Sequence, residues 1–266
     1  MAIALTAATV VAAEAGVSFR GGSGDGAAQL SCPGGMSRLG HVLNAGASIF
    51  DGDPPTSVTI WNTIDPDGYL VESVTAGTHT GTHLDSPGHF IDGGRTVDQL
   101  AAEEFVWPAY VVDVRDRMAH PSPDSFQVSA ADLRRYERAN GRIPAGALVI
   151  LRTGFDELFG TDAYFGDAPG FSGAAVQWMV ENRGVAAVGS DTFGPDATSD
   201  SDYLATYTIL ANDGVALPGL DNLASLSITG DLVMASAVAL ENGSGYQVDP
   251  LACHGARSSS SSRGDD

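Results

Sequence analysis

Three histidines and an aspartate lie within eleven residues of one another, in the segment from Gly77 to Phe90 (GTHTGTHLDSPGHF). The whole 266-residue chain holds six histidines, so this segment concentrates half of them. Imidazole and carboxylate groups together are the ligands with which proteins bind zinc, manganese or iron. The segment therefore predicts a metal site. Its chemistry-bearing side chains are those of His79, His83, Asp85 and His89.

Threonines that alternate with these residues favour an extended strand from Gly77 to Asp85. Successive side chains of a strand point to opposite faces, so His79, His83 and Asp85 would share one face. In a straight strand the two histidines would stand about 13 Å apart. Gly81 lies between them and would allow the strand to bend. We therefore expect these two histidines and the aspartate to bind one metal ion.

His89 follows Pro87, which ends the strand pattern, so it would lie off the line of the other three side chains. This position suits a histidine that moves a proton, or one that hydrogen-bonds Asp85, more than a fourth ligand. Three protein ligands leave open coordination positions, as in catalytic metal sites. One divalent ion, zinc or manganese, would there lower the pKa of a water molecule and polarise a carbonyl group.

The composition narrows the class of partner. The formal net charge is −20, and all 13 basic residues are arginine. Such a charge disfavours nucleic acids and anionic membrane surfaces as partners. No run of residues approaches the ~18 apolar residues of a membrane span. We therefore expect a small-molecule substrate.

Two cysteines, Cys32 and Cys253, lie near opposite ends of the chain and lack the CxxC spacing of redox or zinc motifs. We expect both to be reduced, in a cytoplasmic protein. The first residues are apolar, but no basic residue precedes Arg20. This pattern favours a short helix or an overextended start over a signal peptide.

Composition along the chain predicts one domain with two flanking segments. Residues 1–35 end in a glycine- and serine-rich stretch and are expected to form an N-terminal extension and linker. Residues 36–256 would form the domain, and the serine-rich residues 257–266 a disordered tail.

Within the domain, strands outnumber helices, and the two alternate only in the second half. This pattern predicts an α/β protein with a mixed sheet or β-barrel-like core and flanking helices. Buried strands are expected at 109–114, 147–153, 185–189, 215–217 and 232–240, a strand pair at 57–63 and 69–74, and helices at 130–140, 172–182 and 204–211.

The segment HTGTHLDSPGHF resembles the HxGTHxDxPxHF signature of the cyclase-like metal hydrolases, the family of bacterial kynurenine formamidase and isatin hydrolase. The resemblance extends to FDGDPP, DGGRTVDQL, VILRTGF and PGFSGAAVQWMVENRGVAAVGSDT, and covers roughly residues 39–240. It implies an α/β fold with a β-barrel-like core, a dimer or higher oligomer, and hydrolysis of a formamide, cyclic amide or lactone. It also implies that His79, His83 and Asp85 are metal ligands and that His89 is the acid/base histidine.

The chain departs from the family pattern in its second half. Formamidase-type members place a further histidine and a glutamate, twelve residues apart, where they help to hold a second metal. Alignment through GVALPGLDNL puts Thr206 and Pro218 at these positions. Neither residue replaces the missing ligand, so we expect a divergent, one-metal site.

These observations predict a metal-dependent hydrolase that acts on a cyclic amide, lactone or N-acyl carbonyl substrate through metal-activated water. His89 would move the proton to the leaving group. Trp61, Phe90 and Phe193 are candidate walls of a pocket for an aromatic or cyclic substrate. The alternative is a natural-product cyclase, dehydratase or isomerase on the same scaffold that uses the metal as a Lewis acid. A non-catalytic metal-binding protein is a third reading, which the complete histidine and aspartate set disfavours.

Overall fold

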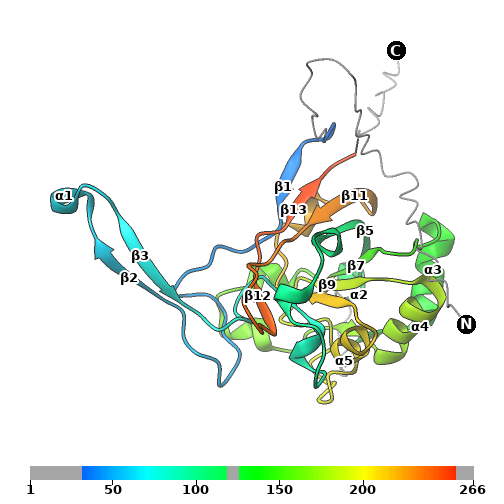
Figure 1. Cartoon of the computed structure of the whole chain (residues 1–266). Coiled ribbons are helices and arrows are strands. Elements are labelled where there is room, and N and C mark those ends of the chain that lie inside the picture. Colours follow the sequence, from blue (N-terminus) through cyan, green and yellow to red (C-terminus); the bar gives the residue numbers. More distant parts are fainter. Residues whose placement is uncertain (1–31, 119–125, 256–266) are drawn as a thin grey trace, which may run out of the picture.

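One curled, mixed sheet forms the centre of the protein, seen in a computed structural model that describes residues 32–118 and 126–255 (Figure 1). In space its strands follow the order β1-β13-β11-β5-β7-β9-β10-β4-β12. The predictions made for residues 1–31 and 256–266 lie outside these ranges. The strands of the sheet are β1 (Met36–Arg38), β4 (His83–Asp85), β5 (Val106–Asp113), β7 (Leu148–Arg152), β9 (Ala187–Ser190), β10 (Val215–Leu217), β11 (Thr229–Met234), β12 (Gly245–Gln247) and β13 (Leu251–Cys253).

The central strands β5, β7, β9 and β10 run parallel, and the strands outside them pair antiparallel. Parallel strands are covered on both faces, which is why they read as nearly continuous apolar runs. The predicted mixed α/β fold is confirmed. The strand predicted at 232–240 is correct only in its first part, because β11 ends at Met234. The chain turns after Leu240, where Gly243 N donates to Leu240 O at 2.9 Å.

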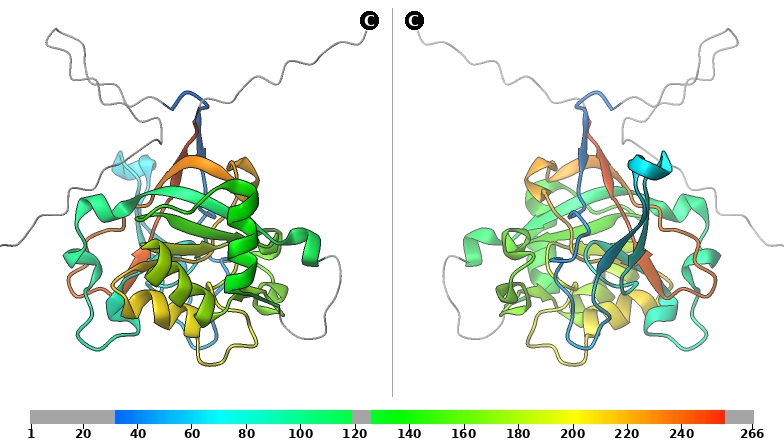
Figure 2. Two further views of the ribbon diagram at one scale, coloured as in Figure 1. Left: turned by 90° about the vertical axis from the view of Figure 1, so that its right-hand side faces the viewer. Right: turned by 90° about the vertical axis from the view of Figure 1, so that its left-hand side faces the viewer.

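Three helices cover one face of the sheet (Figure 2): α3 (Ala130–Asn140), α4 (Gly173–Arg183) and α5 (Leu204–Ala211). Ser129 and Ser172 cap the first two, each accepting a hydrogen bond from the backbone of the first turn. All three helices agree with the sequence prediction. The remaining short elements are α2 (Arg115–Met118), the strand pair β6 (Gln127–Val128) and β8 (Gly170–Phe171), and 3-10 turns at Pro87–His89, Val97–Gln99, Ala102–Phe105, Phe155–Leu158, Asp162–Phe165 and Leu223–Ser225.

Alternation along the central strands divides the core into two layers. Val149 and Leu151 of β7 pack with apolar residues of the helices, whereas Leu148 and Ile150 pack on the opposite face of the sheet. All four side chains are fully buried. The sheet is therefore packed on both faces, and its strand β4 holds part of the histidine segment in a fixed position.

A hairpin extends away from this body (Figure 1). It consists of β2 (Ser57–Asn62) and β3 (Val71–Thr75), which pair antiparallel, and of α1 (Ile64–Asp67) at its tip. We call residues 57–75 the arm. The predicted pairing of these two strands is confirmed. The sequence did not indicate that the pair forms a sheet separate from the main one.

The prediction of two reduced cysteines is wrong. Cys32 and Cys253 form a disulfide, with their Cα atoms 5.1 Å apart. The antiparallel pairing of β1 with β13 places Met36 opposite Cys253, and a turn in which Gly35 N donates to Cys32 O brings the first cysteine back to that strand. Because the pairing joins residues 221 positions apart, spacing in the sequence carries no signal of it.

None of the helices in the described ranges is long and apolar enough to cross a bilayer.

Candidate metal centre and substrate pocket

The histidine segment does not form the single strand that the threonine alternation favoured. A turn closed by Thr80 N and Gly77 O, 3.1 Å apart, precedes Gly81, whose φ of +71° bends the chain. Only His83–Asp85 is a strand, β4, held between β10 and β12. A positive φ is strained for any residue with a Cβ atom, so the glycine at this bend is required by the backbone.

The bend brings the two histidines together. The Nδ1 atom of His79 lies 2.7 Å from Asp85 Oδ1, and the Nε2 atom of His83 lies 3.2 Å from the same oxygen. The two imidazole centroids are 5.3 Å apart. The separation expected of a straight strand is therefore replaced by a compact group around one carboxylate.

The other ring nitrogens of the two histidines are also engaged. His83 Nδ1 donates to the carbonyl of Gly81 at 2.8 Å, so Nε2 is the ring nitrogen that faces Asp85. A hydrogen bond of this kind orients most metal-ligating histidines. The Nε2 atom of His79 lies 2.9 Å from Ser244 Oγ.

His89 belongs to the same group. It ends the 3-10 turn after Pro87, and its ring stacks on that of His79 with centroids 3.7 Å apart and planes 18° apart. Ligand atoms of His79, Asp85 and His89 all lie within 4.8 Å of one another. His89 keeps an exposed face, as an acid/base group would need, but its position also makes it a candidate ligand.

Burial and charge oppose each other at this group. Burial disfavours the charged form of Asp85, but contacts with His83 and His79 outweigh it and hold the pKa of Asp85 well below its usual range. Burial likewise lowers the pKa of His83, but the adjacent Asp85 carboxylate raises it by more. Partial burial lowers the pKa of His89 below its usual value, which keeps this ring neutral at neutral pH.

The donor set fits a single divalent ion. One buried carboxylate and three imidazoles are ligands that zinc and manganese both accept. The two positions that differ from the formamidase pattern supply no side-chain ligand. The hydroxyl of Thr206 donates to Asp196, and Pro218 contributes only its backbone carbonyl, which accepts from His83 N. In the parts of the chain that the structure describes, no other such group of histidine, cysteine and acidic side chains occurs.

The histidines and Asp85 form one end of a cavity of about 280 Å³. Rings from distant segments line the rest of it. Phe165 and Phe193 have centroids 5.6 Å apart, and Phe50 lies 6.1 Å from the first and 6.0 Å from the second. Sequence reasoning named only two of the aromatic side chains that line the cavity, because nothing in the local pattern separates a pocket phenylalanine from a core one. The aromatic side chains that line the cavity are Phe50, Phe90, Phe159, Tyr164, Phe165, Phe193 and Tyr203.

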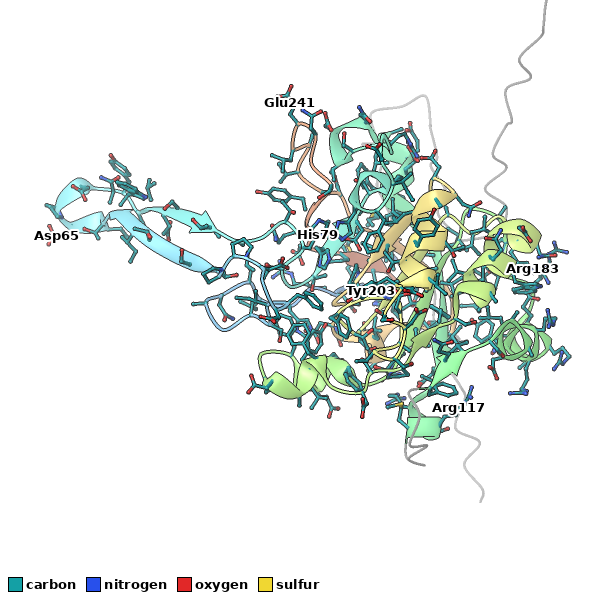
Figure 3. All side chains as sticks on the ribbon, turned by 90° about the horizontal axis from the view of Figure 1, so that it is seen from below. Asp65, His79, Arg117, Arg183, Tyr203 and Glu241 are labelled. Carbon is teal, nitrogen blue, oxygen red and sulfur yellow. A yellow bond between two sulfur atoms is a disulfide. The ribbon has the colours of Figure 1, made fainter. Side chains whose placement is uncertain are left out.

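Of the three predicted pocket walls, Phe90 and Phe193 line the cavity, whereas Trp61 does not. Trp61 lies on the arm with 70% of its surface exposed, and its indole N–H donates to Ser73 Oγ at 2.8 Å. Figure 3 shows His79 and Tyr203 on the body of the protein and Asp65 at the far end of the arm. In a single chain, Trp61 therefore lies outside the cavity that it was predicted to line.

Two buried aspartates, Asp191 and Asp196, were not among the candidate site residues named from the sequence. Asp196 lines the cavity and accepts hydrogen bonds from the backbone of Ala205 at 2.6 Å and of Thr206 at 3.2 Å, the first turn of α5. Asp191 accepts from Thr153 N, Thr153 Oγ1 and Gly154 N. Burial raises the pKa of each aspartate to about 6, against the opposing effect of these hydrogen bonds.

Comparison with known proteins places this site in a family. The sequence pattern of the putative cyclase family matches residues 37–197. The chain belongs to that family. An isatin hydrolase from Roseibium aggregatum is 28% identical over 241 residues, which cover 84% of this chain and 90% of the relative. A kynurenine formamidase from Bacillus cytotoxicus is 28% identical over 172 residues, 64% of this chain and 75% of the relative.

Solved structures of the cyclase family share the fold. Isatin hydrolase A from Labrenzia aggregata, bound to benzyl benzoate, superposes with a TM-score of 0.76 at 27% identity, covering 82% of this chain and 92% of the other. These relatives are named as hydrolases, which supports a hydrolase of the cyclase family for this chain.

Proposed function

We propose that the protein is a metal-dependent hydrolase that opens a cyclic amide or lactone, or cleaves an N-acyl bond, of an aromatic substrate. One observation carries the proposal. Ligand atoms of His79, Asp85 and His89 lie within 4.8 Å of one another, and His83 Nε2 lies 3.2 Å from Asp85 Oδ1, at the end of an aromatic-lined cavity. Acidic and imidazole groups gathered beside an apolar pocket are the usual mark of a hydrolytic metal site.

His79, His83 and Asp85 would hold one divalent ion, zinc or manganese. When bound, the ion would polarise the substrate carbonyl and lower the pKa of water. The hydrogen bond from His83 Nδ1 to Gly81 O keeps that ring in the tautomer whose Nε2 is available to a metal. Asp85 is 3% exposed and so keeps its charge close to the ligand nitrogens, away from solvent.

His89 would handle the proton. Its ring faces the cavity, and its lowered pKa leaves a neutral nitrogen ready to accept a proton from water and return it to the leaving group. Stacking on His79 restricts the rotation of the ring. The proposed role therefore needs no rearrangement of the described side chains.

The cavity favours a small aromatic substrate. Its volume of about 280 Å³ is close to the lower limit for ligand pockets, which suits a one- or two-ring compound. Phe50, Phe165 and Phe193 would contact the ring faces, and the carbonyl would then point to the histidines. The compounds named for the relatives, isatin and kynurenine derivatives, and the benzyl benzoate bound by one of them, belong to this size class.

The replacement of two formamidase ligands by Thr206 and Pro218 favours one alternative, a biosynthetic cyclase, dehydratase or isomerase. Such an enzyme would use the same ion as a Lewis acid without consuming water. The two functions differ in product mass. Hydrolysis adds the mass of one water molecule to the substrate, whereas ring formation or isomerisation does not.

The decisive experiment combines metal analysis with two variants. Purified protein should contain close to one transition metal ion per chain, and should hydrolyse isatin, an N-formyl aromatic amine or an aromatic lactone. His83→Ala should lose metal and activity together. His89→Ala should keep the metal and lose at least about a hundredfold in kcat. Activity in metal-free protein would overturn the proposal. Loss of metal from His89→Ala but not from His83→Ala would make His89 a ligand.

Two further expectations belong to this proposal. A homodimer or higher homo-oligomer is the proposed assembly, and the uncovered arm supports it. The predicted cytoplasmic location rested on reduced cysteines, whereas disulfides persist mainly in oxidising compartments. The location therefore stays a prediction, and the disulfide weighs against it.

A further inference from the structure

Among the acidic side chains that line the cavity, that of Asp53 alone has no partner in the described part of the chain. The cavity is lined by the carboxylates of Asp53, Asp85 and Asp196, and by no arginine. Asp85 contacts the imidazoles of His79 and His83, and Asp196 accepts hydrogen bonds from the first turn of α5. Within the described ranges, no group donates to the carboxylate of Asp53 and no basic side chain pairs with it. Its charge is therefore open to a ligand.

The backbone holds Asp53 against the histidine segment. Asp53 N donates to Phe50 O at 3.0 Å, which closes a turn whose first residue also lines the cavity. Two prolines follow, and each fixes its own φ near about −65°. The ring of Pro54 packs on Gly77, where an added Cβ atom would lie 3.3 Å from the Cδ atom of the proline. The backbone of Asp53 is thus fixed relative to the turn that carries His79.

The charge of Asp53 acts on the end of the cavity where the histidines lie. Burial lowers the pKa of His89, whereas the carboxylates of Asp85 and Asp53 act in the opposite direction. Burial also lowers the pKa of His83, and the same two carboxylates raise it. A group bound beside these imidazoles therefore lies in the electrostatic field of Asp53 as well.

A carboxylate in this position selects a hydrogen-bond donor. The aromatic walls displace part of the water around Asp53, and a half-buried carboxylate that loses water gains from an N–H donor. An ionised carboxylate only accepts hydrogen bonds, so an ester or ether oxygen at the same place would be repelled. The absence of arginine from the cavity lining also disfavours an anionic substrate.

We propose that Asp53 accepts a hydrogen bond from the amide N–H next to the substrate carbonyl, and so selects cyclic amides over lactones. This inference rests on the proposed function and narrows its substrate class. Ring closure places the C=O and N–H of a cyclic amide on the same edge of the molecule. A carbonyl directed at the histidines therefore brings the N–H to the same end of the cavity, where a lactone would present its ring oxygen.

The binding of two unreactive ring compounds tests the contact without the reaction. Indole and benzofuran have nearly the same size, but benzofuran has an oxygen in place of the N–H. In ligand-observed NMR of the full chain, indole should bind at least about tenfold more tightly than benzofuran. Asp53→Ala should lower this preference by at least about tenfold. Asp53→Asn keeps the shape of the side chain and should also lower the preference, because its amide can donate to the oxygen.

Asp51→Ala is the matched control. It removes the same charge from the same turn, but Asp51 is exposed and is not one of the residues that line the cavity. This variant should keep the preference for indole. An unchanged preference in Asp53→Ala, an equal fall in Asp51→Ala, or a parent protein that does not favour indole would each overturn the contact.

Turnover of isatin and N-methylisatin separates this inference from the proposed reaction. The parent should favour isatin, and Asp53→Ala should narrow the ratio of the two kcat/KM values, chiefly by raising KM for isatin. Hydrolysis of isatin with the same ratio in both proteins would overturn the role of Asp53 and leave the proposed function standing. A preference for indole that depends on Asp53, in a protein that hydrolyses neither compound, would count against the proposed function and support the N–H contact.

Discussion

The Nδ1 atom of His79 lies 2.7 Å from the Oδ1 atom of Asp85, although a straight strand would hold these residues far apart. The bend at Gly81 makes the contact possible. The side chain of Gln247 holds the turn from β12, donating to the carbonyls of Gly77 and Thr80. The geometry of the candidate metal centre therefore depends on one turn that a neighbouring strand holds in place.

Substitution at the bend should show this dependence. Gly81→Ala would strain a backbone with φ of +71° and displace His79 from Asp85. We expect a loss of about 1–2 kcal/mol in the free energy of unfolding and at least about a tenfold loss of metal affinity. Gly146→Ala is the control, because its φ is +76°, with nothing within 4 Å of an added Cβ. Equal metal affinities in the two variants, measured by chelator competition, would refute the dependence.

The buried Asp196 should make stability fall with pH in a defined window. Its pKa is raised to about 6 by burial, so the folded state keeps a proton that the unfolded state has lost above about pH 4. The contribution of Asp196 to stability is therefore greatest below that pH, falls between about pH 4 and 6, and then levels off. Asp196→Asn mimics the protonated form. Relative to the parent it should gain up to about 3 kcal/mol between pH 4 and 7 in urea unfolding.

Asp249→Asn removes one negative charge from an exposed residue and serves as the comparison. A gain of the same size in this variant would attribute the effect to net charge rather than to burial of Asp196.

The disulfide should contribute a large part of the stability. It closes a loop of 221 residues between Cys32 and Cys253, and restricts the unfolded chain more than the folded one. We expect the double substitution of both cysteines by serine to lower the free energy of unfolding by about 2–5 kcal/mol. The parent protein should lose the same amount in dithiothreitol, and the double variant nothing. Two free thiols in the unfolded, unreduced parent would contradict the bond.

A hydrogen-bonded chain next to the disulfide should stabilise the same edge of the sheet. His254 Nε2 lies 2.6 Å from Ser37 Oγ, and its Nδ1 lies 3.0 Å from Asp231, which also accepts from Ser227 N and Gly255 N. His254→Phe would leave the buried carboxylate of Asp231 short of one donor. We expect a loss of about 1–3 kcal/mol by thermal unfolding, and a smaller one for Ser37→Ala. Equal losses in both variants would mean that the contact with Asp231 adds nothing.

The sequence by itself determined most of the elements and the residue types of the candidate site. Helices α3 and α4 and the central strands were predictable because serine caps and runs of apolar residues are local signals. The candidate ligands of the histidine segment were also evident, as was Gly81 as a place where the chain could bend. The family resemblance rests on the same local segment, and the family match over residues 37–197 agrees with it.

Only the tertiary structure decided which distant residues meet. The disulfide depends on the pairing of β1 with β13. The aromatic walls of the cavity combine rings from segments that lie far apart in the sequence. The stacking of His89 on His79 depends on the turn after Pro87. Trp61 lies on the arm rather than in the cavity, because β2 pairs with β3 and not with the main sheet. Periodicity records which face of an element is apolar, but the partner of that face is chosen by packing across the whole chain.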